Sequence, residues 1–163
     1  VAAANPGLIS KFGGHAMAAG LSLAQDNYPA FAAAFDAEVR RQLSADDLTG
    51  RLLSDGQLAA EEFNLPLAHA LRQAGPWGQH FPEPLFYGVF QIVQQRLVGE
   101  KHLKLVLKTE CGAAQFDGIA FNVDRELWPN PTVQRAELAY KLEANEFRGR
   151  ESVQLLISHI APA

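Results

Sequence analysis

Alternation of apolar and polar residues is the feature that most restricts the fold of this 163-residue chain. Leu103, Leu105 and Leu107 occupy every second position of residues 102–108, with a histidine and two lysines among the residues between them. Residues 137–143 repeat the pattern with Leu, Tyr and Leu, and residues 153–157 contain a third apolar row. A period of two places the apolar side chains on one face of a strand. Residues 85–161 are therefore predicted to form five strands of a small barrel or sandwich.

Two local features are predicted in this part of the chain, one within a strand and one between two strands. In residues 116–121 the apolar parity slips across Asp117 and Gly118, which predicts a bulge at that glycine. A brief helical turn is predicted around residues 125–128, between the third and fourth strands.

The first half of the chain has a different pattern. A short strand is predicted at residues 21–23, followed by a helix that begins near Pro29, because proline suits the first helical turn. Four apolar side chains then recur at intervals of four residues and predict a stripe that packs on a sheet. They are Phe31, Phe35, Val39 and Leu43.

Residues 46–84 are predicted to connect the two halves. They contain a strand at residues 52–58 and a short helix around residues 66–73, which ends before the turn signal Gly75-Pro76. Trp77 and Phe81 could stack on bases, but the interpretation favoured for a tryptophan among glycines and prolines is packing at a domain junction.

Charge and cysteine content restrict the function. The net charge is −4, so attraction for nucleic acid must come from a local patch. Residues 1–85 carry 5 basic and 9 acidic side chains, whereas residues 86–163 carry 9 of each. The single cysteine, Cys111, excludes an internal disulfide, and Glu110 beside it is expected to raise the pKa of its thiol. No apolar run of membrane length and no signal peptide are found, so a cytoplasmic location without membrane contact is expected.

Residues 12–20 contain two glycines directly before His15, followed by small residues. If the small residues open a helix, the backbone amides at its start and His15 could bind a phosphate ester. The alternative is a tight turn in which His15 satisfies only a backbone carbonyl.

Several motifs together resemble those of known proteins. Residues 12–23 (FGGHAMAAGLSL) resemble the glycine-glycine-histidine motif of the DHHA1 domain, which accompanies DHH-type phosphoesterases. The second half resembles the RecJ single-strand-specific exonucleases of that superfamily, in the order and spacing of six further motifs. These motifs are residues 75–78 (GPWG), 82–86 (PEPLF), 95–100 (QRLVGE), 116–122 (FDGIAFN), 138–142 (LAYKL) and 145–149 (NEFRG).

The resemblance implies an α+β chain in which a partial DHHA1-like domain precedes a five-stranded OB-type β-barrel. The implied parts are residues 1–45 for the end of the DHHA1-like domain, 46–84 for the connecting segment and 85–163 for the OB domain. It also implies that Gly13, Gly14 and His15 hold substrate phosphate, with His15 in a supporting catalytic role.

In the intact enzyme, the resemblance implies that Mn²⁺ or Mg²⁺ activates the water that cleaves a phosphodiester. The Asp-His-His string that holds metal in this superfamily is absent here, and the five histidines are scattered. We therefore expect a C-terminal fragment without cofactor of its own, inactive in isolation, from a 5′ to 3′ exonuclease of single-stranded DNA.

An OB barrel binds oligonucleotides across its second and third strands, between the loop joining strands 1 and 2 and the loop joining strands 4 and 5. Cations and aromatic rings at these places are the predicted DNA-binding residues. In the first loop they are Arg96 and Lys101; on strand 2 they are His102, Lys104 and Lys108; at the end of strand 3 lies Phe121; and in the last loop they are Phe147, Arg148 and Arg150.

Other functions remain open at this point. Lys104 and Lys108 could form an ordinary solvated face that Glu100 and Glu110 balance. The barrel could bind a protein instead of DNA, such as a single-stranded-DNA-binding protein or another repair protein. The glycine motif could also belong to a DHHA1 appendage of an alanyl-tRNA synthetase or a small phosphoesterase, in which case no barrel would follow.

Overall fold

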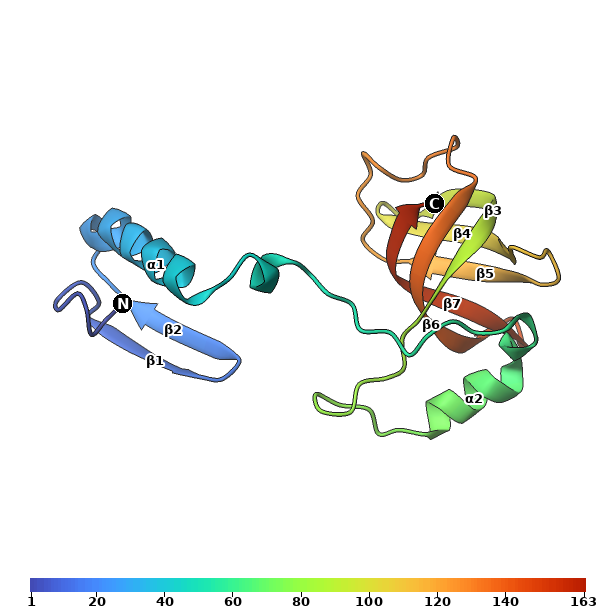
Figure 1. Cartoon of the computed structure of the whole chain (residues 1–163), viewed down its shortest axis with the longest axis horizontal. Coiled ribbons are helices and arrows are strands. Elements are labelled where there is room, and N and C mark those ends of the chain that lie inside the picture. The colour runs from blue at the N-terminus through green and yellow to red at the C-terminus, as the bar shows by residue number, and fades with distance from the viewer. The chain divides into compact units, whose positions relative to one another are not determined.

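The computed structural model describes residues 1–163 as two units, Val1–Arg51 and Leu52–Ala163 (Figure 1). We call them the N-terminal unit and the barrel unit. No helix in either of them is both long enough and apolar enough to cross a membrane.

The N-terminal unit contains one β-hairpin and one long helix. Strands β1 (Lys11–His15) and β2 (Ala18–Ser22) pair in antiparallel fashion, and a 3₁₀ turn (Gln25–Asn27) leads into α1 (Tyr28–Gln42). Pro29 lies in the first turn of α1, as predicted. The predicted strand at 21–23 is the end of β2. A second 3₁₀ turn (Asp46–Leu48) follows the helix.

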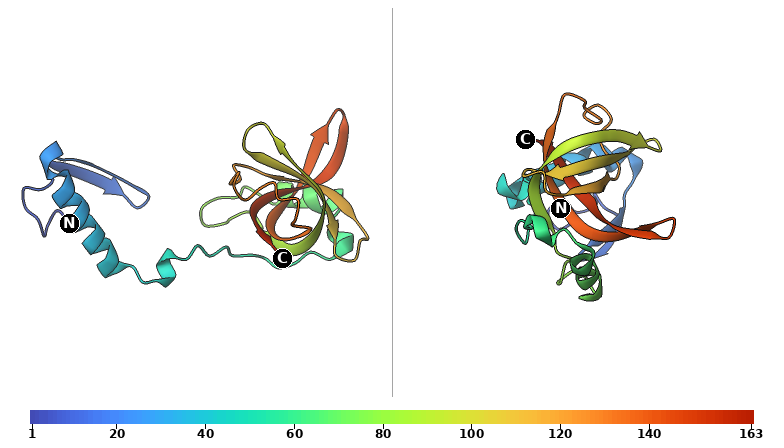
Figure 2. Two further views of the ribbon diagram at one scale, coloured as in Figure 1. Left: turned by 90° about the horizontal axis from the view of Figure 1, so that it is seen from above. Right: turned by 90° about the vertical axis from the view of Figure 1, so that its right-hand side faces the viewer.

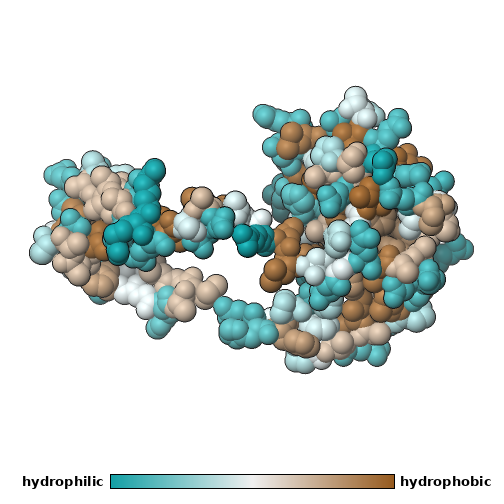
Figure 3. Space-filling model, in the orientation of Figure 1, coloured by the Kyte–Doolittle hydropathy of each residue, from teal (hydrophilic) through white to brown (hydrophobic).

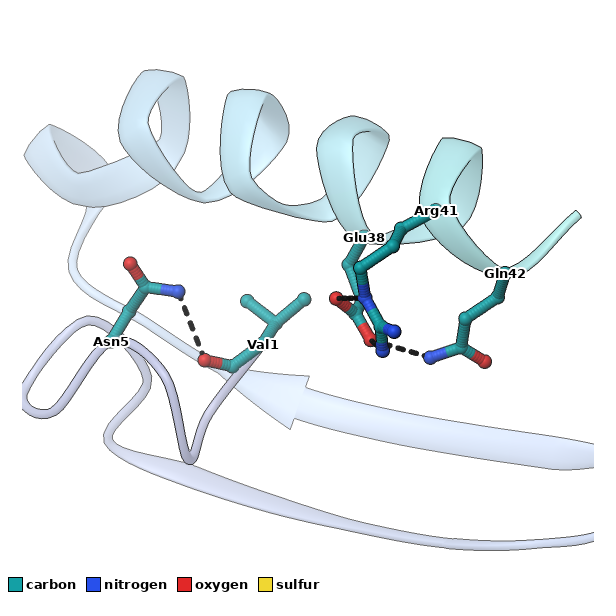
Figure 4. Close-up of polar contacts among 5 residues, drawn as sticks. All are labelled: Val1, Asn5, Glu38, Arg41 and Gln42. Carbon is teal, nitrogen blue, oxygen red and sulfur yellow. Dashed lines mark hydrogen bonds and ion pairs between the residues drawn. The ribbon is translucent and has the colours of Figure 1, made fainter.

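Polar contacts fix the two ends of this unit locally. The Asn5 side-chain amide donates to the Val1 carbonyl at 3.0 Å, and Arg41 forms an ion pair with Glu38 one turn earlier in α1 (Figure 4). Hydrogen bonds from Arg41 and then Gln42 lower the pKa of Glu38 to about 2. Arg40 pairs in the same way with Asp36 at 2.8 Å, so both arginines of the last helical turn have partners on their own helix.

The apolar stripe of α1 faces the hairpin, but it forms no closed core. Phe31, Phe35, Val39 and Leu43 line one groove of about 660 Å³ together with residues of β1 and β2. Phe35 remains 51% exposed, and no residue of this unit is buried. Figure 3 shows apolar side chains at its surface. Two strands and one helix offer too little surface to bury an apolar face.

The barrel unit contains a closed five-stranded barrel. Its strands are β3 (Phe86–Val98), β4 (His102–Thr109), β5 (Gln115–Ala120), β6 (Arg135–Phe147) and β7 (Arg150–Pro162). They close in the order β3-β4-β5-β7-β6, with β5 and β7 parallel and the other pairs antiparallel. This is the strand order of an OB barrel, and it confirms the predicted fold class.

The alternating residues form the core of this barrel, as predicted. Leu103, Leu105 and Leu107 of β4 are fully buried, and so are Leu138 and Tyr140 of β6. Each such side chain contributes about 1.5–3 kcal/mol by leaving water.

The segment before the barrel contributes to the same core. The Phe63 ring, which follows a 3₁₀ turn (Ala60–Glu62), stacks on Phe116 with centroids 4.6 Å apart. Helix α2 (Leu65–Gln73) confirms the helix predicted around 66–73; the Asn64 side chain caps it, and Ala68 is buried against the barrel. In the loop that follows, the rings of Trp77 and Phe81 pack against each other with centroids 4.8 Å apart.

Two local predictions are corrected and a third is confirmed. Residues 52–58 form no strand; instead, single hydrogen bonds join Asp55 and Gly56 to the chain at the start of β3. The β4–β5 register runs without interruption through Gly118, and the irregularities lie in β3 and in the β6–β7 pairing. A Cβ atom at Gly118 would lie 2.8 Å from Leu107 Cδ1, so this glycine makes room in the core. The helical turn expected at 125–128 is a single turn closed by the Trp128 amide on the Asp124 carbonyl.

Candidate nucleic-acid interface

The outer face of β4 presents the cations that the alternation predicted. His102, Lys104 and Lys108 point away from the core because the leucines between them are buried. The Lys104 ammonium lies 2.8 Å from the Asp117 carboxylate on β5. Lys108 has no ion pair, so its charge is available to a ligand.

An aromatic pair lies at one end of this face. Phe121 directly follows β5, is 52% exposed, and meets the His102 ring edge-on at 4.9 Å. The Asn122 amide donates to His102 Nδ1 at 3.3 Å, which fixes the imidazole beside the phenyl ring. Asn122 itself has φ 54°, a left-handed conformation that asparagine tolerates. The exposed phenyl face could therefore stack on a base.

Arg96 belongs to the same face, but it does not lie in the loop where the sequence placed it. It lies within β3, directly opposite Lys104. The bulge between Ile92 and Gln94 shifts the parity of β3, so that Arg96 points outward. Lys101 does lie in the predicted turn, residues 99–101. We call Arg96, His102, Lys104, Lys108 and Phe121 the outer-face residues.

The remaining predicted residues lie at the turn between β6 and β7. Arg148 and Gly149 have φ 53° and 73°, as a two-residue type I′ hairpin turn requires. The Arg148 guanidinium lies 5.2 Å from the Phe147 ring centroid, and Phe147 is 66% exposed. Phe147 and Arg150 form the last strand pair before the turn.

This turn ends a projecting arm. Because β5 pairs with β7 only from Gln154 onward, residues 144–153 extend past β5 as a two-stranded ribbon. Both views of Figure 2 show the β3–β4 and β6–β7 turns on the same side of the barrel. The structure therefore brings together the outer-face residues on one sheet surface and the Phe147–Arg150 cluster on a separate arm.

A polar network that the sequence did not reveal joins α2 to the arm. Arg72 donates to His69 Nδ1 at 2.9 Å, so the proton of the neutral ring is on Nε2, which lies 3.0 Å from the Glu151 carboxylate. His69 and Arg72 lie one turn apart in α2, but Glu151 is 82 residues from His69, so no motif shows this contact. Its effect is to hold the arm against α2 close to the turn, since Glu151 lies one strand pair from the Phe147–Arg150 pair.

The glycine motif does not form the helix start that a phosphate cradle was expected to use. Gly13, Gly14 and His15 lie in β1, exposed, and Met17 lies in the turn to β2. Gly14 is required by close packing, since a Cβ atom there would lie 2.8 Å from Ala19 Cβ. Phosphate binding by these residues stays a prediction.

Two further side-chain predictions concern reactive groups. The pKa of Cys111 is lowered, contrary to the expectation from Glu110, because the Thr109 hydroxyl and then the Ala113 backbone hydrogen-bond to the thiol. Glu110 instead pairs with Arg135. No group of three or more His, Cys, Asp or Glu side chains is arranged to hold a metal ion.

The model of the RecJ OB domain matches residues 54–159, which include the whole barrel up to His159. The chain belongs to the RecJ family. It is 56% identical over 158 residues to the single-stranded-DNA-specific exonuclease RecJ of Dickeya dadantii, covering 97% of this chain and 27% of that protein. RecJ of Escherichia coli is 52% identical over 157 residues, covering 96% of this chain and 27% of the relative.

A solved structure shows the same fold. The crystal structure of RecJ from Thermus thermophilus in complex with Mn²⁺ superposes with a TM-score of 0.70 at 24% identity, covering 94% of this chain and 22% of that one. This chain thus spans about a quarter of the length of the RecJ relatives it matches. Because the RecJ OB match covers the barrel, the alternative of an alanyl-tRNA synthetase appendage is excluded.

Proposed function

We propose that the barrel binds single-stranded DNA as the DNA-handling portion of a RecJ exonuclease that degrades its substrate from 5′ to 3′. The observation that carries this proposal is the convergence of Arg96, Lys104, Lys108 and Phe121 on the β3–β5 surface of an OB barrel. The matched relatives are named as exonucleases specific for single-stranded DNA.

Each group on this surface suits one part of a nucleic acid. Lysine and arginine side chains contact phosphates and fix the position of the strand, without reading its sequence. Phe121 beside His102 and Phe147 beneath Arg148 offer exposed aromatic faces on which bases stack, worth about 1–3 kcal/mol per base. Such a surface binds any single strand, as an exonuclease that advances along DNA requires.

The chemical step belongs to chain outside this barrel. The relatives of known structure hold Mg²⁺ or Mn²⁺. The residues present here do not fit such an ion, because no group of acidic or histidine side chains converges. In this proposal the N-terminal unit is the end of a DHHA1 domain, and Gly13, Gly14 and His15 hold phosphate there. A cytoplasmic role in repair and recombination with other repair proteins, including a single-stranded-DNA-binding protein, completes the proposal.

Fluorescence anisotropy with a labelled oligothymidine tests the proposal on this chain. We expect saturable binding. A plot of the logarithm of affinity against the logarithm of salt concentration should be a falling straight line, whose slope (the salt slope) has a magnitude of about 0.7 per phosphate contact. No binding at low salt by the folded chain would contradict the proposal and would favour a protein as the ligand of the barrel.

A further inference from the structure

Asp117 is the only acidic residue in the three strands that form the proposed DNA-binding surface. Strands β3, β4 and β5 contain three lysines and arginines, Arg96, Lys104 and Lys108, and all three belong to the outer-face residues. Without Asp117 these three strands would carry three positive charges and no negative charge. An acidic residue at this place works against attraction for phosphate.

The position of Asp117 on the surface is central. In the β4–β5 register it lies opposite Val106, so Lys104 and Lys108 are its two diagonal neighbours on β4. The two lysines differ in one respect. Lys104 forms the 2.8 Å ion pair with Asp117, while Lys108 on the same strand and face has no ion pair.

Both members of the ion pair are accessible to a ligand. The Lys104 and Asp117 side chains are 31% and 41% exposed. A carboxylate and a phosphate compete for the same ammonium donors, and the carboxylate also repels an approaching phosphate. The ion pair therefore lowers the affinity of Lys104 for a strand in two ways.

We propose that Asp117 competes with DNA phosphates for Lys104 and so lowers the affinity of the barrel for single-stranded DNA. The inference rests on the proposed function, since it concerns how that surface binds DNA. Its consequence is kinetic: a surface that holds phosphates weakly dissociates faster, because affinity differences between related complexes lie mostly in the off-rate. Asp117 would thereby let a strand advance across the barrel.

Asp117→Asn in the full chain tests the inference, with oligothymidine affinity measured across a salt series. Removing the carboxylate frees Lys104 for one further phosphate contact. We expect binding about fivefold tighter at 0.1 M salt and a salt slope steeper by about 0.7. Glu137→Gln is the charge-matched control, because Glu137 is exposed on β6, which neighbours neither β4 nor β5. It should leave both quantities nearly unchanged.

The two lysines provide a second test, whose first part needs no change at Asp117. With Asp117 present, Lys108→Gln should weaken binding about fivefold at 0.1 M salt, and Lys104→Gln should change it much less. In the Asp117→Asn background, Lys104→Gln should cost as much as Lys108→Gln. This comparison keeps the inference testable if Asp117→Asn does not fold.

The outcomes separate the two proposals. Unaltered chain that binds no DNA overturns the proposed function and this inference with it. Binding by the unaltered chain, with equal or weaker binding by folded Asp117→Asn, overturns the inference alone. Weaker binding would show that Asp117 positions Lys104 for phosphate. Equal losses for both lysine variants with Asp117 present overturn it as well.

Discussion

The two units of this chain carry equally clear apolar patterns but differ completely in burial. In the barrel unit the alternating leucines of β4 are fully buried, whereas Phe35 and Leu43 in the stripe of α1 remain 51% and 43% exposed. A closed barrel provides every strand with two neighbours and an interior. A hairpin and one helix form two layers that are too small to exclude water from the apolar groove between them.

The difference teaches that periodicity indicates which face of an element is apolar, and not whether that face is covered. The stripe of α1 and the rows of β4 follow from the same physical rule. Only the barrel contains enough surrounding chain to exclude water, so stability should be concentrated there.

The sharpest test of this difference is truncation of one apolar side chain in each unit. Leu105→Ala should destabilise the barrel by about 2–5 kcal/mol, through lost transfer energy and a cavity. Urea unfolding followed by tryptophan fluorescence measures this, because Trp128 is buried in the barrel core. Phe35→Ala is the matched variant in α1 and should leave this transition unchanged. A shift as large as that of Leu105→Ala would show that the two units fold together.

Adding a methyl group gives a smaller effect of the same kind. Gly118→Ala should cost the barrel about 1–3 kcal/mol, because the new Cβ lies 2.8 Å from Leu107 Cδ1 and 3.0 Å from Ile157 Cδ1. Gly13→Ala adds the same group in β1, where nothing lies within 4 Å. Thermal unfolding of both variants makes the comparison. Unchanged barrel stability in Gly118→Ala would mean that the core has room at this position.

Sequence reasoning predicted much of the barrel and missed its irregularities. Five strands and the buried rows followed from the period of two. The slip in parity at Gly118 predicts a bulge that the structure lacks, because a glycine that faces the core leaves a gap in the apolar pattern. The true bulge at Ile92–Gln94 left no such mark, because apolar and polar residues alternate poorly around it. Arg96 was therefore assigned to a loop when it lies in β3.

The candidate site was predictable in its residue types and not in its contacts. Cations between buried leucines must face outward, which placed Lys104 and Lys108. The pairing of Lys104 with Asp117 depends on strand register, and the Arg72–His69–Glu151 network depends on how α2 packs on the barrel. Register and packing arise from the whole fold, so local sequence did not reveal either contact.

Arginines in the two units should differ in their effect on DNA binding. Replacing Arg148 and Arg150 together with glutamate should weaken binding to all sequences alike and make the salt slope shallower by about 1 to 1.5. Arg40 and Arg41 of α1 are the matched pair, because Asp36 and Glu38 already neutralise them. Their replacement should leave the slope unchanged in the same anisotropy series. If the two double variants behave alike, the arm is not a contact site.

The smallest expected effect concerns two glutamates whose pKa values move in opposite directions. Burial, and then repulsion by Glu83, raises the pKa of Glu143 on β6, against an attraction from Lys141. A carboxyl with a raised folded pKa binds its proton more tightly when folded, so stability falls as pH rises through that value. Glu143→Gln should therefore stabilise the barrel slightly at pH 7, within about 0.5 kcal/mol. The gain should vanish in acid, where both forms are neutral.

Glu38 of α1 gives the opposite sign. Its pKa is lowered from 4.5 to about 2 by the hydrogen bonds from Arg41 and Gln42, so its contribution is present above pH 4.5 and is lost as pH falls toward 2. Glu38→Gln should therefore weaken α1 at pH 7 and make little difference near pH 2. Thermal unfolding of the barrel and amide exchange of α1, each measured across pH, provide the two readouts. A Glu143→Gln variant that is less stable than the unaltered chain at pH 7 would show that the attraction from Lys141 outweighs burial. The two units would then differ in the burial of their apolar side chains and not in the direction of these two pKa shifts.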